Sequence, residues 1–426
     1  MNTQMSQPNA PMPDSIILRW ARTPGMQGLD AYRQAGGYET ARRVAAGELT
    51  PDQVIETITA SGLRGKGGAG FPTGQKWKFI PRQAPVKYVV VNADEGEPGT
   101  FKDRTLIEGC AHLLIEGILI AAITIGARKA YIYLRKEFYQ GRRLLDAALA
   151  QARAAGFVGE RVFGTDRTVE IVVHSGAGAY IAGEESALLE SLEGRRALPR
   201  LRPPFPAQAG VYQKPTLLNN VETLCHVPVI LALGPDRYKS YGPPALFSVS
   251  GSVVSPGVYE APLGVTLRSL IFKHAGGLRP GRRFKAAFPG GSSSMILTEA
   301  DLDVKMDYDS LHDAGSMLGS AAVIVVDDSA DMVEVIARTV EFYRDESCGK
   351  CTPCREGTVW ITQIFERILH GHGRMEDLAL LESIAKGMTG TCFCPLGESV
   401  PPSLVASLRH FRAEYERRIA TAAPHA

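Results

Sequence analysis

The chain has 426 residues, of which 45% are hydrophobic and 22% are charged. A soluble chain of this size can bury a large core and is expected to form more than one domain. Its 47 Lys and Arg residues nearly balance 45 Asp and Glu residues, leaving a formal net charge of +2. This balance provides no electrostatic footprint for nucleic acid or an anionic membrane, so we expect no nucleic-acid partner.

The leading segment MNTQMSQPNAPMPDS lacks the charged and apolar regions of a secretory signal, which predicts that the protein stays where it is made. The longest apolar stretch, residues 113–127, contains Glu116 and is shorter than the roughly 20 residues that cross a bilayer. We therefore expect a buried helix there and no direct insertion into a membrane.

Helix and strand patterns alternate through the first half of the chain. A helical pattern over residues 50–59 leads into a glycine-rich segment at residues 62–74, and KYVVVN at residues 87–92 predicts a buried strand. Further helix and strand patterns follow in turn, at residues 105–125, 130–134, 137–155, 169–174 and 184–192. This alternation favours an α/β architecture.

The composition changes near Tyr241. The strings FSVSGSV, VSPGVY and LRSLIFKHAGG resemble a strand, a turn and a helix, and AAVIVV at residues 321–326 resembles a further strand. These patterns predict a small, separate α+β domain.

From Asp331 onward, apolar residues repeat with a helical period in four groups, which begin at Met332, Ile361, Leu380 and Leu404. Four amphipathic helices in succession predict a small bundle. Gly371 and Gly387 are expected just past the second and third of these helices, where a left-handed residue commonly ends a helix.

Five of the seven cysteines lie within the last 80 or so residues, and three of them have the spacing CxxCxxC: Cys348, Cys351 and Cys354. This spacing wraps one face of a cubane iron–sulfur cluster and leaves the fourth iron to a distant cysteine. Cys392 and Cys394 are both candidates, and Pro395 favours Cys394, since a proline often follows the remote ligand. Zinc remains an alternative, although zinc motifs generally pair two CxxC knuckles.

The glycine-rich segment contains GxGxxG, formed by Gly65, Gly67 and Gly70. This dinucleotide-binding fingerprint requires a preceding strand, whereas a helix is predicted here, so a standard Rossmann loop is not expected. The glycines still allow backbone amides to approach a flat ring or a phosphate, and Lys66 and Lys76 could neutralise anionic charge. A tight connector loop without a ligand remains the alternative.

Two more loops follow predicted strands. The acidic loop NADEGEPG begins at Asn92, where open α/β sheets place ligand-binding residues, but a solvated surface or a divalent-metal site would have a similar composition. After Gly176 and Gly178, the segment GEES at residues 183–186 begins a predicted helix whose amides could receive a phosphate. Glu184 and Glu185 would oppose that phosphate unless their carboxylates point elsewhere.

Five long strings together resemble the flavoprotein subunit of complex I, the respiratory NADH:quinone oxidoreductase: GLRGKGGAGFPTGQKW, NADEGEPGTFKDR, GAYIAGEESALLESLEGRR, KPTLLNNVETL and ESCGKCTPCREG. The resemblance runs from about Gly62 to the final predicted helix. It implies FMN, a [4Fe-4S] cluster and NADH as substrate.

The resemblance also implies a set of site residues. FMN would be held by Gly65, Gly67, Lys76, Asn92, Asp94, Tyr180, Gly183, Glu184, Asn219, Asn220 and Thr223. NADH would be bound by Phe71, Lys76, Phe79, Glu95, Glu97, Glu185 and Phe205. The cluster would be ligated by Cys348, Cys351, Cys354 and Cys394. Arg202 departs from the Lys that is common before PPFPA in this family, which retains the charge but changes the hydrogen-bond geometry.

The fold implied by the resemblance has four segments. They are an N-terminal helical extension at residues 1–60, a Rossmann-like FMN- and NADH-binding α/β domain with a non-standard glycine loop at 61–240, a ubiquitin-like domain at 241–327, and a four-helix bundle with the cluster at 328–426.

The implied activity is hydride transfer from NADH to FMN, followed by release of single electrons to the cluster and onward to quinone. The implied partners are a thioredoxin-like [2Fe-2S] subunit and the large iron–sulfur subunit, with the complex peripheral to the inner membrane. One alternative is the diaphorase subunit of a soluble NAD-dependent hydrogenase or formate dehydrogenase. Another is a noncatalytic nucleotide-binding module with structural zinc.

Overall fold

A computed structural model describes residues 15–420, so the ends of the first and last predicted segments lie outside the described residues. The chain divides into two compact units. The first contains the described residues up to Gly96 together with Phe101–Phe247 and Val258–Leu263. The second contains Glu97–Thr100, Ser248–Gly257 and the described residues from Gly264 onward. The division into four segments stays a prediction.

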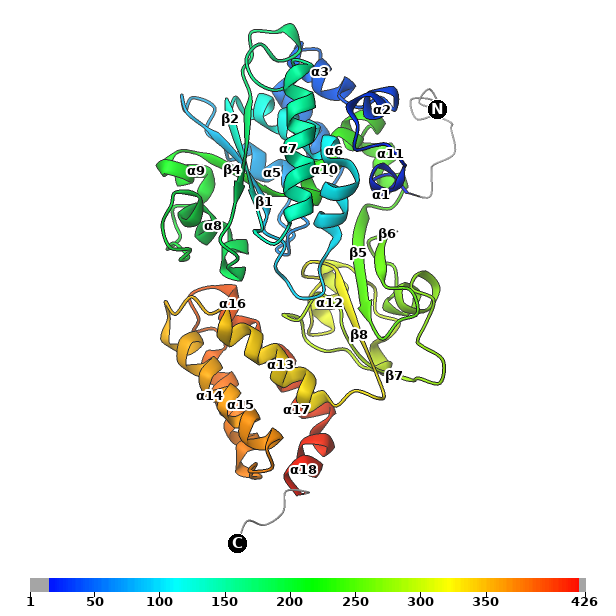
Figure 1. Cartoon of the computed structure of the whole chain (residues 1–426), viewed down its shortest axis with the longest axis vertical. Helices are drawn as coiled ribbons and strands as arrows, with labels where there is room; N and C mark the ends of the chain where they lie inside the picture. Colours follow the sequence, from blue (N-terminus) through cyan, green and yellow to red (C-terminus); the bar gives the residue numbers. More distant parts are fainter. Residues whose placement is uncertain (1–14, 421–426) are drawn as a thin grey trace. The chain divides into compact units, whose positions relative to one another are not determined.

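The first unit is built on a four-stranded parallel sheet with the order β3-β2-β1-β4 (Figure 1). Its strands are β1 (Tyr88–Ala93), β2 (Lys129–Leu134), β3 (Glu170–Ser175) and β4 (Thr216–Asn220). The strands predicted at residues 87–92, 130–134 and 169–174 are therefore confirmed to within a residue or two, as is the α/β class.

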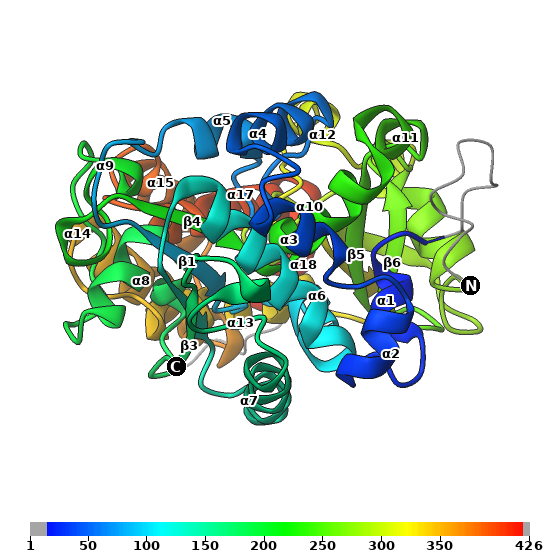
Figure 2. The same cartoon turned by 90° about the horizontal axis from the view of Figure 1, so that it is seen from above.

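Eleven α-helices belong to the described part of the first unit (Figure 2). They are α1 (Leu18–Arg22), α2 (Leu29–Gln34), α3 (Glu39–Ala45), α4 (Pro51–Ala60), α5 (Thr73–Lys78), α6 (Lys102–Ile125), α7 (Tyr139–Ala154), α8 (Glu185–Leu192), α9 (Pro206–Ala209), α10 (Val221–Leu233) and α11 (Pro235–Ser240). Short 3₁₀ turns are η1 (Val162–Gly164), η2 (Tyr180–Gly183) and η3 (Val211–Gln213).

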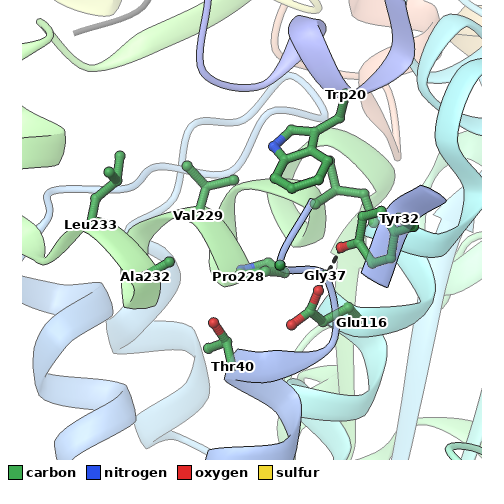
Figure 3. Close-up of a pocket in the computed structure, with 11 residues that line it drawn as sticks. Trp20, Tyr32, Gly37, Thr40, Glu116, Pro228, Val229, Ala232 and Leu233 are labelled. Carbon is green, nitrogen blue, oxygen red and sulfur yellow. Dashed lines mark hydrogen bonds between the residues drawn. The ribbon is translucent and has the colours of Figure 1, made fainter. Parts of the chain in front are cut away.

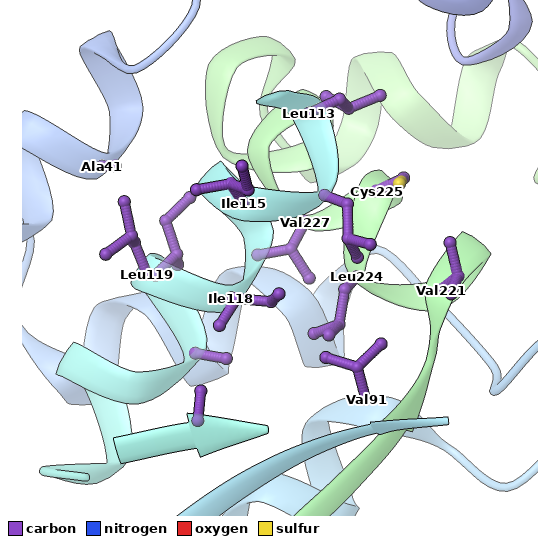
Figure 4. Packing of buried hydrophobic residues seen from close by; sticks show 14 of the residues in the cluster. Ala41, Val91, Leu113, Ile115, Ile118, Leu119, Val221, Leu224, Cys225 and Val227 are labelled. Atoms are coloured by element: carbon purple, nitrogen blue, oxygen red, sulfur yellow. The ribbon is translucent and has the colours of Figure 1, made fainter. Parts of the chain in front are cut away.

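Helices cover both faces of this sheet because its strands alternate apolar side chains between the two faces. Val89 and Val91 join the main core with α6 and α10, and Figure 4 shows side chains of these two helices interlocking above β1. Val90 points to the opposite face, where it packs in a smaller cluster with Leu188 and Leu192 of α8.

Helix α6 is apolar and long enough to pass as a membrane span, with a mean hydropathy of 1.9, but 89% of that window is buried inside the protein. It packs against α10, and Leu114, Ile118 and Leu119 are fully buried. The structure therefore confirms the predicted buried helix.

The amino-terminal end of the described chain is fixed by β6. The carboxylate of Glu260 accepts hydrogen bonds from the backbone nitrogens of Ile16 at 2.8 Å and Leu18 at 2.7 Å. A single carboxylate thus satisfies amides at the start of α1 that have no partner within the helix. This contact helps to explain why Val258–Leu263 belongs to the first unit.

A second sheet has the order β6-β5-β8-β7, and the division between the units passes through its strands β5 and β6. The strands are β5 (Pro244–Gly251), β6 (Gly257–Pro262), β7 (Phe284–Phe288) and β8 (Ala322–Asp327). Strand β8 pairs in parallel with β5 and antiparallel with β7. Its accompanying short elements are the π-helical turn η4 (Ser269–His274), η5 (Glu299–Asp301) and α12 (Tyr308–Asp313). This confirms the predicted mixture of strands and helix.

The remainder of the second unit is helical. Its helices are α13 (Met332–Asp345), α14 (Thr352–Leu369), α15 (Glu376–Met388), α16 (Pro395–Glu398), α17 (Val400–His410) and α18 (Arg412–Ala420). The last predicted helix is wrong as a single element, because Phe411, with φ −125° and ψ 22°, separates α17 from α18.

The two predicted helix-ending glycines have different outcomes. Gly371 follows α14 with φ +80°, as predicted. Gly387 lies inside α15, and Gly390, with φ +71°, is the left-handed residue after that helix. The apolar pattern alone placed the end of α15 too early.

A cavity of about 40 Å³ lies in the first unit, away from every predicted site residue (Figure 3). Trp20, Tyr32 and Thr40 line it together with residues of α6 and α10. The Tyr32 hydroxyl donates to the buried carboxylate of Glu116 at 2.5 Å, and the backbone nitrogen of Tyr38 donates to the same oxygen at 2.8 Å. This carboxylate therefore ties the N-terminal helices to α6.

Candidate functional site

The carboxyl edge of the parallel sheet brings together three asparagines that are far apart in the chain. Strands β1 and β4 are neighbours, and their register places Asn92 opposite Asn220 and Val91 opposite Asn219. Loops at this edge are where open α/β sheets bind ligands. The structure thus places Asn92, Asn219 and Asn220 beside one another, as a shared ligand would require.

The loop after β1 meets the segment that leads into α8. The Asn92 amide donates to the carbonyl of Gly183 at 2.8 Å, and its oxygen accepts from the backbone nitrogen of Asp94 at 3.1 Å. A Cβ on Gly183 would lie 3.5 Å from the carbonyl oxygen of Asp94. On Gly96, a Cβ would lie 3.0 Å from the Tyr180 ring. Four predicted FMN residues therefore converge here: Asn92, Asp94, Tyr180 and Gly183.

The glycine-rich loop approaches the same edge from β4. A Cβ on Gly67 would lie 3.2 Å from Cβ of Asn220, whereas one on Gly68 would meet nothing within 4 Å. Gly68 also has φ +122°, a conformation that side chains disfavour. The loop thus presents bare backbone beside an open space, which fits the close approach of a flat ring or phosphate, and FMN offers both.

The polar groups of the loop have defined partners. The backbone nitrogen of Lys66 donates to the Thr223 hydroxyl at 2.8 Å, and Gly65 donates to the carbonyl of Phe71 at 2.9 Å. The Lys66 ammonium is buried and donates to the carbonyl of Pro244 at 2.8 Å. The suggestion that Lys66 neutralises a ligand is therefore wrong, because its charged end is turned into the protein. Burial lowers the pKa of Lys66 to about 8.

Asn219 is oriented by helix α5. The Trp77 indole nitrogen donates to its side-chain oxygen at 3.0 Å, and both residues are buried. The Asn219 amide group is left to face another acceptor, since each asparagine carries two donors on nitrogen.

A buried ionic cluster supports Asn220 from below. Lys102 contacts Asp103 and Glu222, each at 2.9 Å, and Asn220 donates to Asp103 at 2.5 Å. Burial opposes the charges of Lys102 and Glu222, but their mutual attraction raises the pKa of Lys102 and lowers that of Glu222 to about 2. This lysine and glutamate are therefore held as an ion pair.

Glu95 is directed into the protein toward the start of α6. Its carboxylate accepts from the backbone nitrogens of Asp103 at 2.8 Å and Arg104 at 2.9 Å. Burial and the neighbouring Asp103 raise the pKa of Glu95 to about 8. These contacts give Glu95 a structural position as well as its predicted place near NADH.

Charged side chains at the start of α8 form a partly exposed network. Lys76 lies 3.4 Å from Glu185, and Arg202 lies 2.9 Å from the other oxygen of Glu185. Arg202 also pairs with Glu184. The network brings together predicted FMN and NADH residues, and the arginine that departs from the family pattern bridges two of them.

Glu184 also changes the interpretation of the α8 N-terminus. Its carboxylate accepts from the backbone nitrogens of Ser186 at 3.1 Å and Ala187 at 2.9 Å. The protein's own carboxylate therefore caps this helix, and the hypothesis that its amides receive a phosphate is wrong.

Three predicted NADH residues are large, exposed aromatics. Phe71 and Phe79 are 44% and 54% exposed, and their ring centroids are 6.1 Å apart. Phe205 is 52% exposed. Exposed aromatic rings are uncommon without a function, and such rings can stack on a base.

Glu97 belongs to the second unit with the rest of Glu97–Thr100. Its carboxylate accepts from the backbone nitrogen of Ser293 at 2.9 Å and from the Ser292 hydroxyl at 3.3 Å. The side chain is only partly buried, so it retains a face toward solvent.

The predicted cluster cysteines gather around α14 and α16 of the second unit. Cys351 and Cys394 each occupy the residue immediately before one of these helices. The backbone nitrogen of Phe393 donates to the sulfur of Cys351 at 3.4 Å, and Ser347 lies 3.2 Å from the sulfur of Cys354. N–H and O–H groups directed at sulfur are the environment that iron–sulfur clusters use.

Gly397 allows the two cysteine segments to approach closely. A Cβ at this glycine would lie 2.4 Å from the sulfur of Cys392 and 2.9 Å from Cβ of Cys354. Within residues 15–420, no group of three or more His, Cys, Asp or Glu side chains is arranged around a point suited to one metal ion. The thiol-only set nevertheless fits an iron–sulfur cluster by its donor chemistry.

Cys394 and Cys392 differ in their neighbours. Burial raises the pKa of Cys394 to about 11, and all three cysteines of the CxxCxxC motif contribute to the increase. Burial raises the pKa of Cys392 to about 12, with contributions from Cys351 and Cys354. Pro395 is the first residue of α16, where a helix needs no amide from it, so the residue after Cys394 is locally well suited.

Several supporting residues received no role from the sequence. Trp77, Lys102, Asp103 and Glu222 all lie within the family-like strings, but only the fold shows which asparagine each one contacts. The signal available in the sequence was the charged triplet KDR placed directly before a strongly apolar helix.

Comparison with protein families assigns three parts of the chain. Residues 58–229 match the Nuo51 FMN-binding domain, residues 334–418 match the NADH-ubiquinone oxidoreductase-F iron-sulfur binding region, and residues 246–297 match the SLBB domain. The cofactors are therefore FMN and a [4Fe-4S] cluster, with NADH as substrate.

Related proteins agree with this assignment. An F-type chain of the Rhizobium meliloti NADH-quinone oxidoreductase, the second of that type by its name, is 50% identical over 412 residues, covering 95% of this chain and 98% of that protein. The F-type chain of the Escherichia coli enzyme is 43% identical over 417 residues, covering 96% and 94%. A solved NAD+-reducing [NiFe]-hydrogenase in the H2-reduced state is 36% identical with a TM-score of 0.81, covering 96% of this chain and 67% of that one. This chain belongs to the family of F-type chains of the NADH-quinone oxidoreductases.

Proposed function

We propose that this chain is the electron-input subunit of a complex I, in which NADH is oxidised at FMN and electrons leave singly through the [4Fe-4S] cluster toward quinone. The observation that supports this best is the meeting of Asn92, Asn219 and Asn220 with the glycine-rich loop at one edge of the sheet. FMN supplies the exchange between two-electron and one-electron chemistry, which neither NADH nor a cluster can perform alone.

The proposed FMN residues divide the work of binding. Gly65 and Gly67 provide close backbone contact, and Lys76 provides positive charge. The polar side chains Asn92, Asp94, Asn219 and Asn220 would fix the ring through hydrogen bonds, supported by Tyr180, Gly183, Glu184 and Thr223. The register of β1 and β4 and the Trp77 contact pre-organise this set, which reduces the entropy lost on binding.

The proposed NADH residues supply stacking and charge. Phe71, Phe79 and Phe205 would stack near the adenine, and Lys76, Glu95 and Glu185 would line the substrate site. Glu97 would accept a ribose hydroxyl and repel the extra phosphate of NADPH. No side chain needs to donate or remove a proton for hydride to leave the nicotinamide, so the buried His226 is assigned a structural role beside Glu222 and Tyr238.

For the cluster, we propose Cys348, Cys351, Cys354 and Cys394 as ligands. Cys394 is favoured over Cys392 by Pro395 and by its proximity to all three motif cysteines. Thiols must lose their protons to ligate iron, and nearby N–H groups stabilise the resulting negative charge.

We extend the proposal to the finer fold and the assembly. The first unit's sheet is consistent with a Rossmann-like domain, the second sheet with a ubiquitin-like domain, and α13, α14, α15 and α17 with a four-helix bundle. The expected partners are a thioredoxin-like [2Fe-2S] subunit and the large iron–sulfur subunit. The complex would lie in the cytoplasm, peripheral to the inner membrane.

The second candidate is a diaphorase subunit of a soluble hydrogenase, favoured by the structural likeness to the NAD+-reducing enzyme. The higher identity to the F-type chains of NADH-quinone oxidoreductases, over nearly their whole length, supports complex I instead. Proteins that copurify with the chain separate the two: membrane antiporter-like subunits support complex I, and a nickel subunit supports the hydrogenase.

The central experiment mixes anaerobically reconstituted protein with NADH. Flavin absorption at about 450 nm should bleach within the mixing time, since hydride transfer removes the oxidised flavin chromophore. Reconstituted protein that binds FMN and iron but does not bleach would contradict the proposed function. Protein that contains zinc and neither iron nor FMN would support the noncatalytic alternative.

A further inference from the structure

The second unit holds the short segment Glu97–Thr100 at three points. Besides the Glu97 contacts, the Thr100 hydroxyl lies 2.5 Å from the Ser320 hydroxyl. Gly99 packs on β8 so closely that a Cβ would lie 2.6 Å from the Ile324 side chain. Residues on both sides of the segment belong to the first unit, so these contacts determine where Glu97 lies.

Glu97 itself rests in a cradle formed by Gly291, Ser292 and Ser293. Gly291 has φ +94°, and a Cβ there would lie 2.5 Å from a carboxylate oxygen of Glu97. The backbone nitrogen of Ser293 donates to that same oxygen at 2.9 Å. Only glycine leaves room for the carboxylate in this position.

A buried tyrosine extends the cradle to helix α13. The Tyr343 hydroxyl lies 2.8 Å from the Ser292 hydroxyl, and the Tyr343 side chain is fully buried. The Ser292 hydroxyl lies 3.3 Å from the Glu97 carboxylate. Since a carboxylate can only accept, Ser292 donates to Glu97 and Tyr343 can donate to Ser292.

We propose that Gly291, Ser292 and Tyr343 are positioning residues for Glu97 and thereby set the preference for NADH over NADPH. This inference rests on the proposed role of Glu97 as the carboxylate that meets the adenine ribose. A carboxylate discriminates against a second phosphate only when it is held at the right place, and a mobile one can turn away. The SLBB part of the chain would then contribute to nucleotide selectivity through a residue outside its own sequence.

The test compares Ser292→Ala and Tyr343→Phe with the parent in the intact complex. Two quantities are measured: the ratio of kcat/KM for NADPH to that for NADH, and the dissociation constants of NADP+ and NAD+. Loss of one hydrogen bond to a charged group should raise the selectivity ratio toward NADPH about fivefold for each variant. Gly291→Ala should have a larger effect, and the two milder variants preserve the test if it fails to fold.

Tyr415→Phe is the matched control. Tyr415 is also fully buried in the second unit, and its hydroxyl lies 2.8 Å from that of Ser407. The control removes the same kind of tyrosine–serine contact without touching the cradle. An unchanged selectivity ratio supports the proposal, whereas a change as large as that of Tyr343→Phe would overturn it.

A double-mutant cycle with Glu97→Ala separates this inference from the proposed function. If Ser292 acts through Glu97, then Ser292→Ala adds no change in selectivity once the carboxylate is gone. An equal effect in both backgrounds would overturn the inference. So would a selectivity change in Glu97→Ala without one in Ser292→Ala or Tyr343→Phe. If Glu97→Ala itself leaves selectivity unchanged, the assigned role of Glu97 fails, and the inference with it.

Discussion

The indole nitrogen of Trp77 donates a hydrogen bond to the side chain of Asn219 across 3.0 Å, although 142 positions separate the two residues in the chain. Trp77→Phe removes this donor and part of a fully buried ring. We expect unfolding to become easier by about 1–2 kcal/mol and FMN to dissociate about fivefold more readily. Flavin retained after gel filtration, measured by absorbance, provides the check.

Trp360→Phe is the control for that variant, because Trp360 is 52% exposed and belongs to the second unit. It should retain flavin as the parent does. If Trp77→Phe retained flavin equally well, the indole would have no part in orienting Asn219.

Arg202 should contribute to nucleotide binding through its bridge between Glu184 and Glu185. Arg202→Ala leaves both carboxylates without this partner, and we expect the KM for NADH to rise about tenfold with little change in kcat. Arg202→Lys keeps the charge but loses the forked geometry, so its KM should lie between the other two. Steady-state kinetics with NADH and an artificial acceptor would measure this, and equal KM values for all three proteins would count against it.

Cys394→Ser should abolish the [4Fe-4S] cluster, whereas Cys392→Ser should retain it. A serine in place of a ligand removes the thiolate, while Cys392 is assigned no iron. Iron content and the electron paramagnetic resonance spectrum of the reduced protein would distinguish the two variants. The opposite pattern would show that Cys392 is the fourth ligand.

Glu97→Gln should relax selectivity toward NADPH, because the amide can still accept a hydrogen bond but does not repel a phosphate. The expected result is measurable NADPH oxidation with a modest loss of NADH affinity. Turnover of NADPH at the parent's rate would remove the carboxylate from nucleotide selection.

Glu116 should make stability depend on pH. Burial raises its pKa, although the Tyr32 hydroxyl and backbone amides lower it in part. The folded state therefore binds the proton more tightly than the unfolded state. This contribution is complete below the unfolded pKa of roughly 4.5 and is lost as pH rises through the folded pKa.

Glu116→Gln provides the comparison, since it keeps the shape of the side chain without a titrating group. Relative to the variant, the parent should lose up to about 1.4 kcal/mol per pH unit within that window. Urea unfolding of both proteins at pH 5 and pH 8 would measure the difference. A parent–variant difference that is the same at both pH values would contradict the prediction.

The regular elements could be predicted because their patterns are local. The strand at Tyr88–Ala93 and the helix at Lys102–Ile125 have strong apolar runs, and both are found with small differences at their ends. The break at Phe411 could not be predicted, since the apolar period continues from Leu404 through Tyr415 while the backbone turns. Packing within the bundle, which the period does not encode, decides that break.

The site could be predicted only in its membership. The family-like strings contain the residues that meet at the sheet edge, but the direction of each side chain depends on tertiary contacts. Lys66 was expected to face a ligand and instead binds the carbonyl of Pro244, because folding brings β5 to its ammonium group. Glu184 was expected to turn away from its helix and instead caps it.

The burial of α6 has a consequence for assembly of the protein in the cell. While the chain is being synthesised, residues 102–125 leave the ribosome about a hundred positions before α10, the helix that covers them. During that interval the segment has the hydropathy of a membrane anchor. Lys102, Asp103 and Glu116 would make its insertion into lipid costly, since their compensating contacts exist only in the folded state. The same charges that organise the finished core therefore also guard the nascent chain against entering the bilayer.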